Sequence, residues 1–159
     1  MIFVSVGSMF PFDRFIRLMD DWAAAHPEEV VFAQIGTGEY EPQHMDYARS
    51  LSGKDFIEKV KSARVVVSHA GMGNIISSRQ HGVPCVLFAR HASLGEHTTN
   101  HQLHTADRFR ETPGLFVADT EEMLPVQIEA AAKMDASENL LEPHAPQPFI
   151  DKLRQYIYG

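Results

Sequence analysis

One segment combines the residue types that bind an anion without a basic patch. Val65–Ser68 is a run of strand formers, and the residues that follow it are His69, two glycines at Gly71 and Gly73, and Asn74. This order predicts a strand, a tight turn and the start of a helix. The free N–H groups and positive dipole at such a helix start attract anions, most often a phosphate.

A second glycine turn, Gly7-Ser8, follows the apolar run Ile2–Val6 and is another candidate phosphate cradle. Spacing alone leaves open that both segments are only tight strand-to-helix turns. Neither is followed by the Gly-Lys-Ser/Thr of a P-loop, and neither fits Gly-x-Gly-x-x-Gly. A P-loop nucleotidase and a dinucleotide-dependent dehydrogenase are therefore disfavoured.

The nine histidines raise the question of a metal site. His97, His101 and His104 are spaced i, i+4, i+7 and would share one helix face, a pattern that a zinc or manganese hydrolase could use. No His-Glu-x-x-His motif accompanies them, so a polar, ligand-facing stripe is favoured and no metal is expected. Cys85, the one cysteine, lies in an apolar run and is interpreted as a buried strand residue rather than a nucleophile.

The elements that would position these residues alternate between strand and helix. Strands are expected at 2–6, 30–35, 65–68, 85–89 and 115–118, with a short one near 47–51. Helices are expected at 12–23, 56–63, 74–81, 97–110 and 121–134, and at the C-terminal end after a proline-rich linker. Such alternation predicts a parallel sheet with helices on both faces, and ligands then bind beyond the carboxyl ends of the strands.

Composition excludes several classes of protein. The chain has 159 residues, 44% of them hydrophobic, which fits one domain over 1–159. A net charge of −7 argues against nucleic acid as a partner. No apolar run approaches the roughly 20 residues that span a bilayer, and the start lacks the basic region of a signal peptide. A cytoplasmic protein is expected, with any membrane attachment made through a partner.

Several motifs together resemble the C-terminal, donor-binding half of glycosyltransferase family 28. They occur in order from Met1 to Val117: VSVGS at Val4–Ser8 with Phe12-Asp13, SHAGMGN at Ser68–Asn74, GVP at Gly82–Pro84, Glu96-His97, NHQ at Asn100–Gln102 and ADRF at Ala106–Phe109. The chain is most similar to stand-alone versions of that half, which are small catalytic subunits of bacterial exopolysaccharide transferases and of the eukaryotic dolichol-linked N-acetylglucosamine transferase.

The resemblance implies a Rossmann-like domain, the C-terminal half of a GT-B fold, that binds a UDP-sugar as donor substrate and needs no cofactor. Three residues are implied in the chemistry: His69 as a donor to the diphosphate, with His101 and Gln102 contacting the sugar. The wider donor site implied comprises Gly7, Ser8, Gly71, Met72, Gly73 and Asn74 for the diphosphate, Phe56 and Ile57 for the uracil, and Glu96, His97 and Asn100 beside the sugar.

Two positions need separate comment. Ser77 stands where the relatives have a carboxylate for the ribose, and its hydroxyl can still hydrogen-bond a ribose, though more weakly than a charged acceptor. Arg90, in a loop of the exopolysaccharide type, could pair with the diphosphate or an acidic sugar, or be a solvated loop cation. The last of these is favoured.

The resemblance also implies a divided enzyme. In the relatives, a separate membrane-anchored subunit binds a lipid-linked acceptor, and a chain of this length accounts for one half only. The expected function is therefore the donor-binding subunit of a two-component hexosyltransferase, recruited to the inner membrane face by its partner. The alternative is a non-catalytic nucleotide-sugar-binding or regulatory module.

Overall fold

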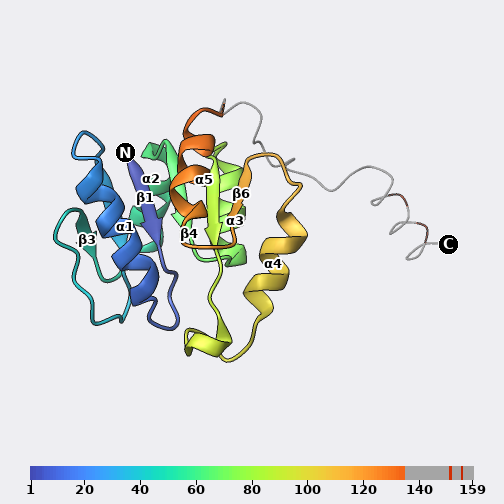
Figure 1. Cartoon of the computed structure of the whole chain (residues 1–159). Coiled ribbons are helices and arrows are strands. Elements are labelled where there is room, and N and C mark those ends of the chain that lie inside the picture. Colours follow the sequence, from blue (N-terminus) through green and yellow to red (C-terminus); the bar gives the residue numbers. More distant parts are fainter. Residues whose placement is uncertain (135–150, 152–154, 156–159) are drawn as a thin grey trace.

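The computed structural model describes residues 1–134, 151 and 155. Its core is one sheet of six parallel strands, in the order β3-β2-β1-β4-β5-β6. The strands are β1 (Ile2–Ser5), β2 (Val31–Gln34), β3 (Asp46–Ala48), β4 (Val65–Ser68), β5 (Cys85–Phe88) and β6 (Leu115–Ala118). The expected parallel α/β sheet is confirmed (Figure 1).

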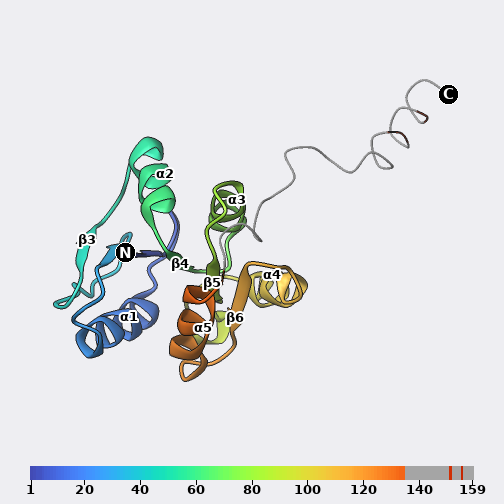
Figure 2. The ribbon, with the colours of Figure 1, turned by 90° about the horizontal axis from the view of Figure 1, so that it is seen from above.

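Helices cover both faces of this sheet. They are α1 (Asp13–Ala25), α2 (Gly53–Ser62), α3 (Met72–Gln80), α4 (His101–Phe109) and α5 (Met123–Ala132), with a 3₁₀ turn, η1 (Ala92–Leu94), before α4. One hydrophobic cluster joins α1 and α5 to the sheet, and a second joins α2, α3 and α4 to its other face. Figure 2, which looks down on the molecule, shows these helices around the sheet.

The two-residue period of the strands explains the two clusters. In β1, Ile2 and Val4 belong to the cluster with α1 and α5, whereas Phe3 belongs to the other. Ser5 ends the strand, and its side chain points to the same face of the sheet as that of Phe3. Its hydroxyl therefore lies on the side of the sheet that α3 covers, within hydrogen-bonding reach of Asn74.

The strand order reverses direction between β1 and β4. From β1 the chain proceeds outward to β2 and β3, and from β4 it proceeds the other way to β5 and β6. The loops that leave β1 and β4 therefore diverge, and this is where doubly wound sheets form a ligand crevice. Those loops contain Gly7-Ser8 and His69–Gly71.

Two helix starts differ from the sequence expectation by three residues or more. The second helix begins at Gly53, because Ser52 caps it by accepting a hydrogen bond from the Asp55 N–H at 3.1 Å. The fourth begins at His101, so His97 precedes it and does not lie on its face. The proline-rich linker and the expected C-terminal helix lie outside the described residues, apart from 151 and 155.

Candidate functional site

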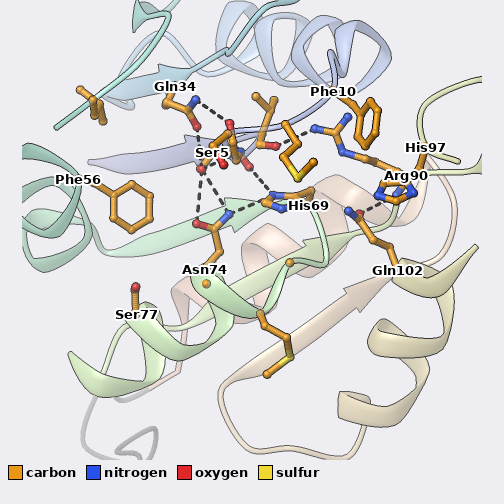
Figure 3. A pocket seen from close by; sticks show the side chains of 18 of the residues that line it. Ser5, Phe10, Gln34, Phe56, His69, Asn74, Ser77, Arg90, His97 and Gln102 are labelled. Carbon is orange, nitrogen blue, oxygen red and sulfur yellow. Dashed lines mark hydrogen bonds between the residues drawn. The ribbon is translucent and has the colours of Figure 1, made fainter. Parts of the chain in front are cut away.

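A cavity of about 470 Å³ opens at the carboxyl ends of β1 and β4. Figure 3 shows side chains from both sheet halves and from α3 and α4 converging on it. It is lined by the following residues: Ser5, Val6, Gly7, Ser8, Met9, Phe10, Gln34, Leu51, Gly53, Phe56, His69, Gly71, Met72, Gly73, Asn74, Ser77, Arg90, His97, His101 and Gln102.

This lining brings together most of the residues that the sequence pointed to. All of the predicted donor-site residues line the cavity except Ile57, Glu96 and Asn100. Within the described chain, Arg90 is the one permanently charged side chain of the lining, and the lining contains no Asp or Glu. A protein with a net charge of −7 has thus kept carboxylates away from this cavity.

The start of α3 faces the cavity with free backbone donors. Gly71 is its N-cap residue, and within the described residues no side chain caps this end. Met72 and Gly73, the first residues of the helix, line the cavity. The orphan N–H groups of a first helical turn, together with the dipole, are suited to an anion.

The ring of His69 is wedged between the two glycine turns. A Cβ placed on Gly7 would lie 2.5 Å from His69 Cε1, and one placed on Gly71 would overlap Nε2. Gly7 also has a φ of 79°, which disfavours other residues. These glycines therefore make room for an imidazole, whereas a Cβ on Gly73 would meet nothing within 4 Å.

Three side chains form a hydrogen-bonded network beneath this ring. Gln34 Nε2 donates to the carbonyl oxygens of Gly7 (2.8 Å) and Arg49 (3.2 Å), and the Ser5 hydroxyl donates to Gln34 Oε1 (3.0 Å). Asn74 Nδ2 lies 3.3 Å from Ser5 Oγ and 3.1 Å from His69 Nδ1. Ser5 is fully buried, and Gln34 and Asn74 are nearly so.

Sequence reasoning missed Ser5 and Gln34. A glutamine that ends the apolar strand Val31–Gln34 is out of character for a buried sheet, and that was the available signal. Asn74, which the resemblance assigned to the diphosphate, lines the cavity. Its side-chain amide also contacts Ser5 and His69, so in this structure it supports the His69 ring.

His69 is neutral at physiological pH. Burial, and then the nearby Arg90 guanidinium, lower its pKa to about 4. A neutral imidazole carries one N–H, so the ring offers the cavity either a donor or an acceptor.

Arg90 corrects the sequence interpretation of a solvated loop cation. Its side chain is only 2% exposed. The guanidinium donates to the carbonyl oxygens of Pro11 (2.6 Å), Val6 (2.7 Å) and Glu96 (3.3 Å). Burial lowers the pKa of Arg90 to about 10, which leaves it charged. Arg90 therefore ties the loop after β1 to the loop after β5 and places a positive charge behind the cavity.

Two residues expected beside the sugar are bound to other partners in this structure. Glu96 accepts from Arg14 Nε (2.6 Å) and Nη2 (2.9 Å) and from the His91 N–H (2.9 Å). Asn100 Oδ1 accepts from the Ala92 N–H at 2.9 Å. Both hold the loop around η1 in shape, and neither lines the cavity.

His101 and Gln102 both line the cavity, but they differ in their exposure to solvent. Gln102 is 4% exposed, and its Oε1 accepts from the Arg90 N–H at 3.2 Å. His101 is exposed, and its Nδ1 lies 2.9 Å from the Thr99 hydroxyl. The start of α4 at His101 places both in the first turn of the helix, which is the condition for them to share one ligand.

His97 stands between Phe10 and His101, with ring centroids 4.9 and 4.4 Å apart. Burial, followed by His101 and Arg90, lowers its pKa. His104 does not line the cavity. Among the described residues, no group of three His, Cys, Asp or Glu side chains could hold a metal ion.

The opposite end of the cavity is formed by Phe56 and Ser77. Figure 3 shows them at the end away from His97 and Gln102, with His69 and Asn74 between. The Phe56 ring packs edge-on against Phe3, at 5.5 Å between centroids. Ile57, its neighbour on α2, does not line the cavity.

Twelve of the lining residues form two sets that differ in burial and in hydrogen bonding. We call the floor the set of buried or half-buried, hydrogen-bonded residues: Ser5, Gln34, His69, Asn74, Arg90 and Gln102. We call the rim the more exposed set at the mouth: Ser8, Met9, Phe10, Met72, His97 and His101.

The sequence model of the glycosyltransferase family 28 C-terminal domain matches residues 1–157. The chain belongs to this family. No curated protein matches the sequence significantly. The matched span covers every element of the family 28 domain described above.

Several solved structures share the fold of this family 28 domain. The glycotransferase of kitacinnamycin is 22% identical with a TM-score of 0.66, and the match covers 84% of this chain but 34% of that protein. MurG of Acinetobacter baumannii is 14% identical, with a TM-score of 0.58 and coverage of 97% and 49%. ALG13 is 19% identical with a TM-score of 0.60, and the match covers 96% of this chain and 93% of ALG13.

The chain thus spans about a third to a half of the first solved structures that it matches, 34% and 43% of their lengths. It spans nearly all of ALG13. The fold is that of a GT-B glycosyltransferase domain. Among the described residues, no helix is long and apolar enough to cross a membrane.

Proposed function

We propose that this domain is the donor-binding half of a hexosyltransferase that uses a UDP-sugar and a lipid-linked acceptor. The acceptor would be held by a separate membrane-anchored subunit that recruits this chain to the inner membrane face for polysaccharide or glycan assembly. The observation that carries the proposal is the cavity between the β1 and β4 loops. It presents backbone donors and a neutral imidazole and excludes carboxylates.

The shape of the cavity suggests one orientation of the donor. Phe56 offers an aromatic face and Ser77 a hydroxyl at one end, which suits uracil and ribose. The helix start at Gly71 and the His69 ring lie in the middle, where a diphosphate would bind. Gln102 lies at the other end, where the sugar would bind, and His101 precedes it at the start of α4.

The same groups would assist the transfer. When the bond from the sugar to the diphosphate breaks, negative charge develops on the leaving UDP. Donors already aimed at that charge stabilise the transition state more than the ground state, without reorganisation. Arg90 adds a buried positive charge behind them. We propose no cofactor and no metal for this step.

The exposed apolar side chains of the rim favour a partner that covers the mouth of the cavity. Met9, Phe10 and Met72 are 70%, 36% and 47% exposed there, and Leu94 in η1 is 60% exposed. Apolar side chains gathered around a binding site commonly mark a surface that another domain covers. The larger glycosyltransferases, of which this chain spans about a third to a half, have further chain to supply such a domain.

Titration of the purified chain with UDP tests donor binding. We expect UDP to shift the amide signals of Gly71–Asn74 in ¹H–¹⁵N spectra. Uridine, which lacks phosphate, should shift signals near Phe56 and Ser77 but leave those of Gly71–Asn74 in place. Signals that respond only elsewhere in the chain would contradict the proposal.

A second measurement tests whether sugar transfer requires the acceptor-binding subunit. The isolated chain should transfer no sugar, and addition of membranes that contain the acceptor-binding subunit should restore transfer. His101→Ala should then abolish most of that activity, whereas His104→Ala, on the same helix but away from the cavity, should not. Robust transfer by the chain alone, or full activity of His101→Ala in the complex, would refute the proposal.

A further inference from the structure

The floor contains more buried hydrogen bonding than an anion site needs. Backbone donors alone can hold a phosphate. Here the ring of His69 is connected through Asn74 and Ser5 to Gln34, residues on β4, α3, β1 and β2. The partners of this network bear on which nitrogen of His69 carries the proton.

The donors and acceptors in this series of hydrogen bonds can be assigned one after another, starting from Gln34. Gln34 Nε2 faces two backbone carbonyl oxygens, at 2.8 and 3.2 Å, and a carbonyl can only accept. The amide is therefore oriented with Nε2 toward them and Oε1 toward Ser5 Oγ, at 3.0 Å. An amide oxygen accepts as well, so the single hydroxyl proton of Ser5 is directed to Gln34.

The next two contacts follow from that assignment. With its proton used, Ser5 Oγ accepts from its neighbours, and the Gly7 N–H donates to it at 3.2 Å. Both ends of the Asn74 amide lie near Ser5 Oγ, Nδ2 at 3.3 Å and Oδ1 at 3.5 Å, and the nearer end also faces His69 Nδ1, at 3.1 Å. Because Ser5 Oγ now only accepts, the nearer end is assigned as the NH₂ group. An NH₂ group only donates, so Nδ1 of the ring is an acceptor without a proton.

We propose that Gln34 and Ser5 are positioning residues that, through Asn74, hold His69 with its proton on Nε2. Within residues 1–134, no hydrogen bond is formed by Nε2, and this atom lies between Gly7 and Gly71 at the cavity. The ring is thus set as a donor toward the anion. The opposite tautomer would direct a lone pair at the anion, and its Nδ1–H would have only the Ser5 carbonyl oxygen, at 3.4 Å.

The consequence for binding rests on the proposed function, whereas the tautomer itself does not. A donor on Nε2 attracts a phosphate oxygen and a lone pair there repels it, so the network would act as a switch for diphosphate affinity. The two claims separate experimentally, because the tautomer is measured without any ligand.

The imidazole nitrogens of His69 report the tautomer directly in ¹⁵N spectra, since protonated and bare nitrogens resonate far apart. We expect the ligand-free protein at neutral pH to show a protonated Nε2 and a bare Nδ1. A protonated Nδ1 would overturn the inference. The expected tautomer in a protein that fails to bind UDP would leave the inference standing and sink the proposed function instead.

Gln34→Met removes the start of the network while keeping a long side chain. We expect His69 to populate the Nδ1–H form and the affinity for UDP and for inorganic pyrophosphate to fall about tenfold, with the uridine-induced shifts retained. The control is Gln43→Met, an exposed glutamine in the loop before β3, which should change neither. An unchanged tautomer in folded Gln34→Met would overturn the role of Gln34.

Asn74→Asp provides a second variant that is close to isosteric. A carboxylate accepts from Nδ1–H, so the tautomer should invert even if Gln34→Met fails to fold. The readout is again the imidazole spectrum, which also distinguishes the inverted neutral ring from an imidazolium protonated on both nitrogens. Retention of the Nε2–H form in Asn74→Asp would contradict the inference.

Discussion

The floor and the rim of the cavity are built on opposite principles. In the floor, Arg90 is 2% exposed and donates to three backbone carbonyl oxygens, and Ser5, Gln34 and Asn74 bond to one another. In the rim, Met9 is 70% exposed, and the exposed side chain of His101 bonds to the neighbouring Thr99. The floor thus serves the fold and the ligand at once, whereas the rim is free to serve a ligand or a partner.

Arg90 gives the largest test of this difference. Arg90→Met leaves the carbonyl oxygens of Val6 and Pro11 without their donor, and we expect a loss of about 3 kcal/mol or more in the free energy of unfolding. Urea denaturation measures it. The control, Arg108→Met on the exposed side of α4, should lie within about 0.5 kcal/mol of the wild type. Equal losses in the free energy of unfolding for the two variants would contradict the structural role given to the floor.

Acid should weaken the protein through His69. The unfolded chain has a histidine pKa of about 6.5, whereas the folded state has a His69 pKa of about 4. The unfolded state therefore binds this proton first, and the stability present above pH 6.5 is lost as the pH falls toward 4. The loss is about 3 kcal/mol in all, at about 1.4 kcal/mol for each unit.

The measurement is urea denaturation across that range. His69→Gln should flatten the pH dependence between pH 6.5 and 4, whereas His104→Gln, on exposed α4, should preserve it. A wild-type curve with no slope in this window would show that the His69 ring is more accessible than its position between Gly7 and Gly71 implies.

Alanine substitutions of Gly71 and Gly73 should change the free energy of unfolding in opposite directions. The Cβ of Gly71→Ala overlaps the His69 ring, although its φ of −98° permits alanine, so we expect a loss of about 1–3 kcal/mol. Gly73→Ala has open space around its Cβ and lies in α3, so a gain of up to about 1 kcal/mol is expected. Thermal unfolding compares them, and a His69 spectrum that changes in Gly73→Ala but not in Gly71→Ala would reverse the assignment.

The smallest expected difference in the free energy of unfolding is between variants of Gln102 and His101, which are neighbours in the first turn of α4. Gln102→Ala removes the acceptor of the buried Arg90 N–H and should lower the free energy of unfolding by about 1–2 kcal/mol. His101→Ala should change it by less than about 0.5 kcal/mol. Chemical denaturation distinguishes them. If His101→Ala were the more damaging, His101 would belong to the floor.

The sequence predicted the sheet because each strand is a compact apolar run bounded by turn residues. It also predicted which loops meet, because parallel strands carry their carboxyl ends to one edge. The start of α2 was placed too late, although Ser52, a good capping residue, marked it.

What the sequence did not disclose were the long-range polar contacts. Glu96 pairs with Arg14 across 82 positions, and Ser5 meets Asn74 across 69. No local pattern specifies such a pair, since each residue is equally compatible with solvent or ligand. Arg90 illustrates the same limit, because burial of its guanidinium depends on three carbonyl groups that only the fold assembles.

The wedge of His69 between Gly7 and Gly71 also constrains how this domain can change. Positions 69 and 71 are coupled, because a Cβ at Gly71 avoids the overlap only where the imidazole has been replaced by a smaller side chain. Gly7 is constrained further, since its φ of 79° disfavours a side chain whatever stands at position 69. A designed library that varies position 71 should therefore vary position 69 with it, because the two side chains compete for the same space.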